Sequence, residues 1–210
     1  VKAGQLLPAG FHGVSSKMKP DPYDTKTAKK LMADAGYPDG FKMTIHGPND
    51  RYINDAKIAE ALAQMLNRVG IEASVETMPK AVYFKRASRG GPNKSPEFSF
   101  MLLGWGAGSG EASSPLKALL HTYDKSKGLG AANRGRHSDA EVDKLVKQAL
   151  ATVDADARGA LLAKATEKAV GENYGVIPMH YQVNTWAAKA GYKYLPRTDE
   201  RTIVTGLSQN

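Results

Sequence analysis

A chain of 210 residues with 41% hydrophobic content is long enough to bury one large core or two small ones. It contains no run near the roughly 18 consecutive apolar residues of a membrane helix, and the absence of cysteine excludes disulfides, thiolate nucleophiles and cysteine-bound metals. The formal charge of +8 comes from 29 basic and 21 acidic residues that are scattered over the chain. We therefore expect a solvated basic surface and no nucleic-acid partner.

Segment 23–41 carries the start and stop signals of a helix. Asp24 is a good N-cap, because its carboxylate can accept from unpaired backbone N–H groups of the first turn. Gly36 followed by Pro38 is typical of a helix end. The apolar residues between them recur at helical spacing: Ala28, Leu31, Met32 and Ala35. The pattern predicts one amphipathic helix.

Strands and helices alternate after this helix. We expect a strand at 41–47, a long helix at 52–69 stopped by Gly70, a half-buried strand at 71–78, a short helix at 81–88 and a buried strand at 98–103. The alternation favours an α/β architecture, with a mixed sheet flanked by helices.

The second half of the chain is more helical. Ser138 followed by Glu141 predicts a capping box ahead of an apolar helix face. Asp154 or Asp156 starts the next helix, which extends to about residue 172. Residues 177–179 open a β-type stretch, and 192–210 lack a clear periodic face.

Five sequence landmarks follow one another in a fixed order. They are Tyr23-Asp24 with residues 35–41, the unit 64–75, the segment 98–107 that ends in Gly-Trp-Gly-Ala, the segment 133–145, and Ile177-Pro178. Together they resemble the second, C-terminal lobe of the extracytoplasmic solute-binding proteins of peptide and nickel ABC importers, solute-binding protein family 5. The resemblance implies a lobe of the periplasmic-binding-protein type II fold, in which two lobes close on a ligand.

The resemblance also implies a domain organisation. Residues 1–180 would form the ligand-binding lobe, and 181–210 would cross the hinge and complete a first lobe that this sequence lacks. A loosely docked terminus of a self-contained domain is the alternative for this tail. The implied location is periplasmic, with a signal peptide upstream of this sequence. The implied partners are a peptide or small-molecule ligand, the N-terminal lobe and the permease subunits of the importer; a sensor role is compatible with the same fold.

The loop 104–110 is the first candidate for ligand contact. Trp105 offers a flat apolar wall, and the glycines let backbone polar groups approach a ligand closely. We therefore place Trp105, Gly106, Ala107, Gly108 and Ser109 in the site. The alternative is that Trp105 is a core aromatic and the glycines are plain turn residues.

Other loops supply polar candidates. These are Asn49, Arg51 and Tyr52 after the first strand, Arg86 near the short helix, and Asn133 and Arg134 before the capped helix. A guanidinium suits a carboxylate or phosphate because it makes paired charge-assisted hydrogen bonds. The alternative for each arginine is that it is a solvated surface residue without ligand contact.

Gly108 departs from the family pattern. Peptide-binding relatives usually carry an aspartate at this position, which pairs with the α-ammonium of the peptide. Its absence leaves room for a modified peptide, an anionic solute or a sugar-like solute. Glu111, three residues further on, could replace the aspartate.

Catalytic, metal-ligating and cofactor-binding residues are not expected. The five histidines lie apart in the sequence, without the spacing of a zinc site. Ser114 and Lys117 match S-x-x-K, but the companion K-T-G is missing. The alternatives to a binding lobe are a basic nucleic-acid or polyanion-binding module, and a hydrolase or transferase that depends on Arg51 or Ser114.

Overall fold

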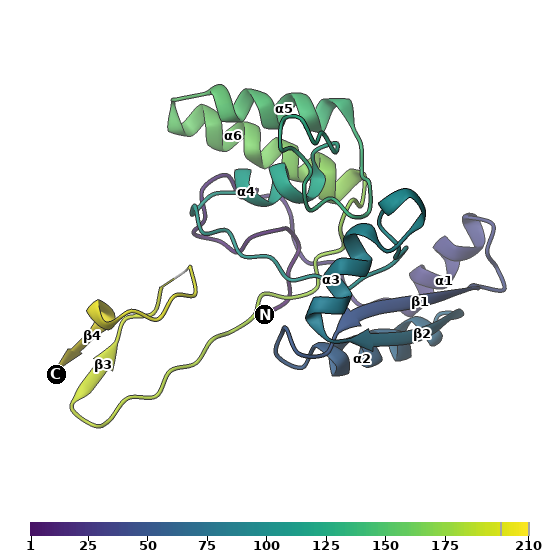
Figure 1. Ribbon diagram of the computed structural model, residues 1–210, viewed down its shortest axis with the longest axis horizontal. Helices are drawn as coiled ribbons and strands as arrows, with labels where there is room; N and C mark the ends of the chain where they lie inside the picture. Colours follow the sequence, from purple (N-terminus) through teal and green to yellow (C-terminus); the bar gives the residue numbers. More distant parts are fainter. Residues whose placement is uncertain (198, 210) are drawn as a thin grey trace. The chain divides into compact units, whose positions relative to one another are not determined.

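The computed structural model describes residues 1–197 and 199–209. The chain forms two compact units, which we describe separately (Figure 1). Unit 1 comprises Val1–Asp21 and Trp105–Asn210, and unit 2 comprises Pro22–Gly104. The predicted boundary near residue 180 does not coincide with this division and stays a prediction.

Unit 2 is a small α/β arrangement around two parallel strands. Its elements are α1 (Thr25–Asp34), β1 (Phe41–Pro48), α2 (Asp55–Asn67), β2 (Ile71–Met78), α3 (Lys80–Arg89) and a short 3₁₀ turn at Pro92–Lys94. β1 pairs with β2 in parallel, from Phe41 opposite Ile71 to Pro48 opposite Met78. The connection through α2 is the usual way to join parallel neighbours.

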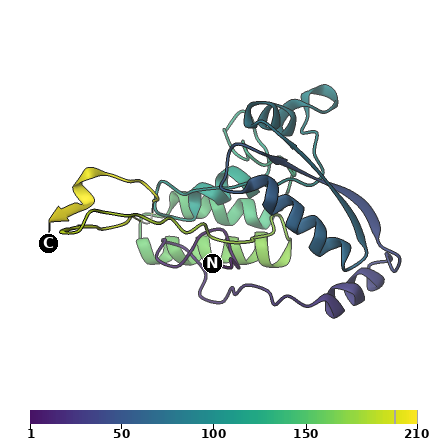
Figure 2. The same ribbon diagram turned by 90° about the horizontal axis from the view of Figure 1, so that it is seen from below.

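The two faces of this strand pair differ. α2 lies along one face (Figure 2), where Ile45 packs against Ala59 and Ala63. On the other face, α3 covers the carboxyl-terminal end, where Met78 packs against Tyr83. The first half of that face is polar, with Thr44 hydrogen-bonded to Ser74 and Lys42 paired with Glu72.

Local signals predicted most of the helices and strands of unit 2, although α2 begins three residues later and ends two residues earlier than predicted. β2 has the predicted bounds, and α3 exceeds its prediction by one residue at each end. Asp24 caps α1 by accepting from the backbone N–H groups of Lys26 and Thr27 at 2.9 and 3.0 Å. Gly36 adopts a φ of +88°, as expected for a left-handed helix stop.

The strand predicted at 98–103 was wrong. The segment makes a single bridge to β1, in which His46 N donates to Phe100 O at 3.0 Å and Leu102 N donates to His46 O at 2.8 Å. Phe98 and Leu102 are nevertheless buried. The apolar run reflects burial, and burial alone does not separate a strand from a buried loop.

Unit 1 is built around two helices that lie side by side (Figure 1). They are α5 (Ala140–Ala151) and α6 (Ala155–Thr166), which continues as a π-helix over Glu167–Glu172. A short α4 (Ser113–Pro115) and a π-turn at Leu116–Leu120 precede them. The buried side chains include Leu116, Leu120, Val142, Val146, Leu162 and Ala165.

One of the two helix starts predicted in unit 1 needs correction. Asp139, and not Ser138, caps α5 by accepting from Glu141 N at 2.8 Å and Val142 N at 2.9 Å. The Ser138 hydroxyl instead bonds the hydroxyl of Thr122. Asp154 is the N-cap of α6, one of the two predicted starts.

The β-type stretch expected at 177–179 is not a strand. It makes isolated hydrogen bonds to the start of the chain, including Ala3 N to Met179 O at 3.2 Å, followed by Tyr181 N to Val1 O at 2.7 Å. Further on, β3 (Tyr192–Tyr194) pairs antiparallel with β4 (Leu207–Gln209), with a 3₁₀ turn at Val204–Gly206 between them. Among the described residues, no helix is both long and apolar enough to cross a membrane.

Candidate functional site

The loop after Gly104 exposes most of its predicted site residues. Trp105 is 40% exposed, so the alternative that it is a core aromatic is wrong. Ala107 is buried and its carbonyl accepts from Gly110 N at 3.1 Å, while Ser109 is exposed. A Cβ atom added at Gly106 or Gly108 would meet nothing within 4 Å. The loop therefore presents an indole and open backbone to its surroundings.

The far end of this loop is tied down by polar contacts. Glu111 accepts from Arg158 Nε at 2.9 Å, and it also accepts from Arg158 Nη2 and the Ser113 hydroxyl. Burial raises the pKa of Glu111, but the hydrogen bonds from Arg158 and Ser113 outweigh it and hold the pKa below its ordinary value. The carboxylate is ionised and already paired, so Glu111 has no free charge with which to replace the missing aspartate.

The loop between β1 and α2 positions three predicted residues. The buried carboxylate of Asp55 accepts from the backbone N–H groups of Arg51 and Tyr52 at 2.9 and 3.0 Å. The Arg51 guanidinium lies 5.1 Å from the centre of the Tyr52 ring. The side chains of Asn49 and Arg51 are exposed. Sequence analysis missed Asp55, although an acidic residue at the start of a helix after a polar loop is a signal for such a turn.

Tyr52 is packed against the end of unit 2. Its hydroxyl donates to Gly104 O at 3.3 Å, and a Cβ at position 104 would lie 2.6 Å from its ring. Gly104 therefore allows a close approach of the ring that a larger residue would block.

Arg86 belongs to an ion-pair network. Its Nε donates to both oxygens of Glu97 at 3.0 Å, and its Nη1 donates to Glu76 at 2.5 Å. The hydrogen bonds from Arg86 lower the pKa of Glu76 and of Glu97, and the same bonds raise the pKa of Arg86. With two carboxylate partners, Arg86 has less to offer an anionic ligand, and its ligand role stays a prediction.

Asn133 is a buried structural residue. Its amide nitrogen donates to His121 O at 3.0 Å and His137 O at 2.6 Å, and its amide oxygen accepts from His137 N at 2.9 Å. With 2% exposure, the side chain has no surface to present to a ligand. Arg134 is half-buried beside it. The ligand role of Arg134 stays a prediction.

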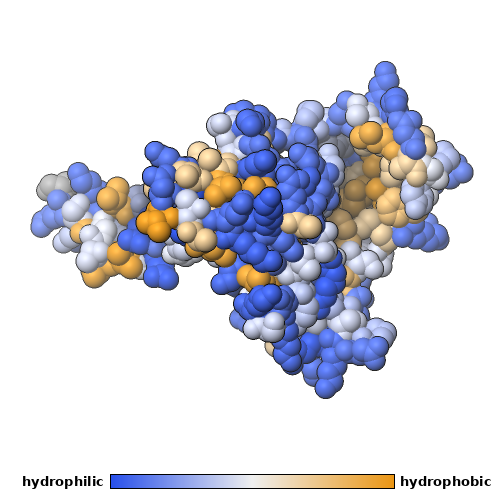
Figure 3. Space-filling model, turned by 90° about the horizontal axis from the view of Figure 1, so that it is seen from above, coloured by the Kyte–Doolittle hydropathy of each residue, from blue (hydrophilic) through white to orange (hydrophobic). Residues whose placement is uncertain are grey.

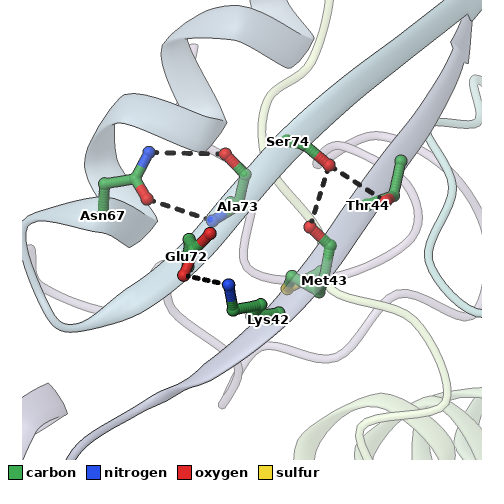
Figure 4. A pocket seen from close by; sticks show the side chains of 7 residues that line it. All are labelled: Lys42, Met43, Thr44, Asn67, Glu72, Ala73 and Ser74. Atoms are coloured by element: carbon green, nitrogen blue, oxygen red, sulfur yellow. Dashed lines mark hydrogen bonds and ion pairs between the residues drawn. The ribbon is translucent and has the colours of Figure 1, made fainter.

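A surface depression lies over the polar half of the strand pair (Figure 4). It is lined by Lys42, Met43, Thr44, Asn67, Glu72, Ala73 and Ser74. Its polar groups pair with one another: the Asn67 amide, for example, accepts from Ala73 N at 3.0 Å and donates to Ala73 O at 3.4 Å. None of the predicted site residues lines this depression, and we place no ligand there. The part of the chain that the structure describes contains no cluster of three or more side chains suited to a metal ion.

Comparisons with known proteins agree with the landmarks in the sequence. Residues 1–127 match the family model described as bacterial extracellular solute-binding proteins, family 5 Middle. The chain is 31% identical over 178 residues to the glutathione-binding protein GsiB of Shigella flexneri, which covers 84% of this chain and 33% of that protein.

Two solved structures share the fold. The periplasmic binding protein DppA of Helicobacter pylori, in complex with the peptide STSA, matches with a TM-score of 0.73 and 27% identity over 85% of this chain and 33% of that one. HbpA2 of Haemophilus parasuis matches with a TM-score of 0.84 and 21% identity over 100% of this chain and 40% of that one. The fold is thus that of the type II periplasmic binding proteins. The chain spans 28% and 33% of the length of the first two curated relatives that it matches.

Proposed function

Because the chain belongs to family 5 of the bacterial extracellular solute-binding proteins, we propose that it is a ligand-binding lobe of the substrate-binding component of an ABC importer. Its ligand is a peptide or a related small polar solute, held in a cleft between two lobes. The observation that carries this proposal is the exposed loop 104–110, where an indole stands beside glycines with open space around them. Such a surface suits a small molecule that is recognised by stacking and by backbone hydrogen bonds.

The charge of the loops supports an anionic or modified peptide as the ligand. Gly108 carries no carboxylate and Glu111 is paired with Arg158, so a free α-ammonium finds no counter-charge in residues 104–111. The exposed guanidinium of Arg51 is suited to a carboxylate. Glutathione, the ligand named for the Shigella flexneri relative, carries two carboxylates that suit a guanidinium, together with one free α-ammonium group. We include Asn49, Arg51, Tyr52, Trp105, Gly106, Gly108 and Ser109 in the contact set.

A further lobe is part of the proposal. Leu31 on α1 is 61% exposed, and Tyr37, Phe41 and Met65 of the same unit are also exposed. Figure 3 shows orange side chains among blue ones on the right of the view, the side on which α1 is drawn in Figure 1. Complete burial of a side chain such as Leu31 under a partner lobe would stabilise the two-lobe protein by about 1.5–3 kcal/mol. Such a surface supports a partner lobe in the same protein, with 1–180 in one lobe and 181–210 crossing to the other.

The remaining parts of the proposal rest on the family. The protein acts in the periplasm, delivers its ligand to membrane permease subunits, and catalyses no reaction. An upstream signal peptide belongs to the same proposal. The scattered positive charge gives no reason to add nucleic acid to the partners.

Native mass spectrometry of the gently purified natural protein tests the binding function. We expect a small polar solute that dissociates on denaturation. Trp105→Ala should then weaken binding of that solute about tenfold or more, as for aromatic hot spots, and leave the melting temperature largely unchanged. Trp186→Ala is the matched control, because Trp186 lies in the tail and bonds Thr202. A purified protein that retains only nucleic acid, released at high salt, would support the polyanion alternative instead.

A further inference from the structure

We propose that Glu111 and Arg158 are positioning residues: their ion pair anchors the Trp105 loop to α6 in the orientation that receives the ligand. The inference rests on the proposed function. It assigns neither residue a direct contact with the ligand.

The loop needs an anchor because its own backbone is permissive. Residues 106, 108 and 110 are glycines, and Gly110 has a φ of +74°. A glycine-rich segment loses more conformational freedom on ordering than other segments do. The buried methyl of Ala107 fixes one point of the loop. The next fixed point is Glu111, directly after Gly110.

The anchor reaches a rigid part of unit 1. Arg158 lies in the first half of α6, whose N-cap is Asp154 and which packs along α5. Its guanidinium makes a two-point contact with the Glu111 carboxylate across 47 positions of sequence. The Glu111 and Arg158 side chains are only 16% and 28% exposed. Partial burial and two-point geometry make this pair stronger than an exposed ion pair.

His12 reinforces the same anchor. Its backbone brackets Glu111, because His12 N donates to Gly110 O and Ala112 N donates to His12 O, both at 3.0 Å. Its ring lies over Gly159 of α6, where a Cβ would come within 2.9 Å of the ring. A glycine inside a helix is destabilising. The close approach of the His12 ring explains why a glycine is nevertheless present at position 159. The ion pair between Glu111 and Arg158 and the contact of the His12 ring with Gly159 thus hold the end of the loop on α6.

The anchor has a defined dependence on pH. The groups that face Glu111 are Arg158, Ser113 and His12, and they hold the pKa of Glu111 below its ordinary value although burial raises it. The stabilisation from a carboxylate with a lowered pKa is present above its unfolded pKa and disappears as the pH falls through the folded pKa. We therefore expect an unchanged loop between pH 7 and 5 and its release only in more acidic solution.

Fluorescence of Trp105 tests the anchor without any ligand. The chain has two tryptophans, so Trp186→Phe leaves Trp105 as its single reporter. In that background, Glu111→Gln and Arg158→Gln should each raise acrylamide quenching of Trp105 about twofold, as expected for a locally released loop. Arg158→Lys keeps the positive charge but loses the guanidinium that makes two parallel hydrogen bonds. Its quenching should therefore lie between that of the glutamine variants and that of the parent. The double variant should add little to either single variant, because the two residues act as one unit.

A matched control separates positioning from loss of stability. Glu141→Gln removes the ion pair with Lys168 in the same unit, and it should leave Trp105 quenching unchanged. Equal quenching in the parent, Glu111→Gln and Arg158→Gln would overturn the proposal, and so would an equal rise in Glu141→Gln.

An acid titration of the Trp186→Phe protein keeps the test decisive if the glutamine variants fail to fold. A rise in quenching that precedes the loss of helical circular dichroism supports the anchor, whereas coincidence of the two changes overturns it.

With the solute found by mass spectrometry, the folded variants should bind about tenfold more weakly, in line with a misplaced contact group. Failure to find any solute would count against the proposed function and leave the quenching result standing.

Discussion

Asn133 joins two turns of unit 1 through a side chain that is sealed from solvent. Each of its three hydrogen bonds goes to a backbone group of His121 or His137, so the amide substitutes for backbone pairing where the chain is irregular. Buried backbone groups without partners are costly. This explains why an asparagine in a loop can matter as much as a core residue.

Asn133→Ala should therefore lower the free energy of unfolding by about 2–3 kcal/mol, since it leaves buried polar groups unpaired. Asn49→Ala is the matched control, because the Asn49 side chain is exposed and has no partner among the described residues. It should change stability by less than about 0.5 kcal/mol. Urea denaturation measures both, and similar values for the two variants would contradict the structural role of Asn133.

Gly108 is the position at which a single side chain could change ligand preference. A carboxylate fits there without strain, because a Cβ meets nothing within 4 Å and the backbone does not require glycine. Gly108→Asp should leave the melting temperature within about 2 °C of the parent. It should also raise the affinity for peptides with a free amino terminus relative to their N-acetylated forms, by roughly tenfold for one new ion pair.

Isothermal titration of each peptide pair with the natural protein and with Gly108→Asp measures this preference. Gly135→Asp, at an exposed glycine outside the contact set with equal open space, serves as the control. An unchanged preference in Gly108→Asp would show that this residue does not face the amino end of the ligand.

At the level of elements, the start of α5 depends on one carboxylate. Asp139 accepts from two first-turn N–H groups and from the Asn173 amide at 2.9 Å. The hydrogen bond from Val142 N, with those from Asn173 and Glu141 N, holds the pKa of Asp139 below its ordinary value against the opposing effect of burial. Its stabilisation is therefore present at neutral pH and disappears as the pH falls through that lowered pKa.

Asp139→Ala should cost about 1 kcal/mol at pH 7, as is typical for loss of an N-cap. Ser138→Ala should cost less, because it loses only the bond to Thr122. Thermal unfolding at pH 7 and at about pH 2.5, below the ordinary pKa of aspartate near 3.9, checks both. The cost of Asp139→Ala should shrink at the lower pH; a cost that stays constant would mean that the charge of Asp139 is irrelevant to the cap.

Sequence patterns predicted those elements whose ends are set by neighbouring residues. Gly70, with a φ of +98°, ends α2 in the way its position in the sequence indicates. The strand at 98–103 was wrong because a strand requires a partner for its whole length, and β1 offers this segment one bridge only. The capping-box pattern indicated Ser138 as the N-cap of α5, and the structure places the cap one residue later, at Asp139.

The candidate site was less predictable for a physical reason. Loop positions such as Trp105 and Arg51 could be proposed from residue type alone, and the structure finds them exposed. Some partners that position other residues lie far away in sequence, as Arg158 does from Glu111. A single sequence carries no local signal for such pairs.

At the scale of the whole molecule, the described residues of the tail beyond Tyr181 make their hydrogen bonds among themselves. Tyr181 still bonds the start of the chain, through its N–H to Val1 O and its hydroxyl to Gln5 O and Leu7 O. From residue 182 onward, every hydrogen bond of the described residues joins two members of the tail, such as Trp186 with Thr202.

Removal of residues 183–210 should therefore leave the melting temperature of the remaining chain within about 2 °C. The matched truncation before Tyr181 also removes all the bonds of Tyr181 to the start of the chain, including the one from the Val1 ammonium group to Tyr181 O, and should lower the melting temperature by several degrees. Differential scanning calorimetry compares the two truncations. A large loss in the shorter deletion would mean that the tail stabilises the body of the chain.

The amide of Asn67 has a consequence for the behaviour of the protein in concentrated solution. It occupies both backbone groups of Ala73 on the outer edge of β2, as a neighbouring strand would (Figure 4). An open strand edge invites pairing with another copy and hence aggregation. Asn67 thereby blocks the first half of this edge. Light scattering of Asn67→Ala should reveal self-association at concentrations where the parent stays monodisperse, and identical scattering would mean that other features guard this edge.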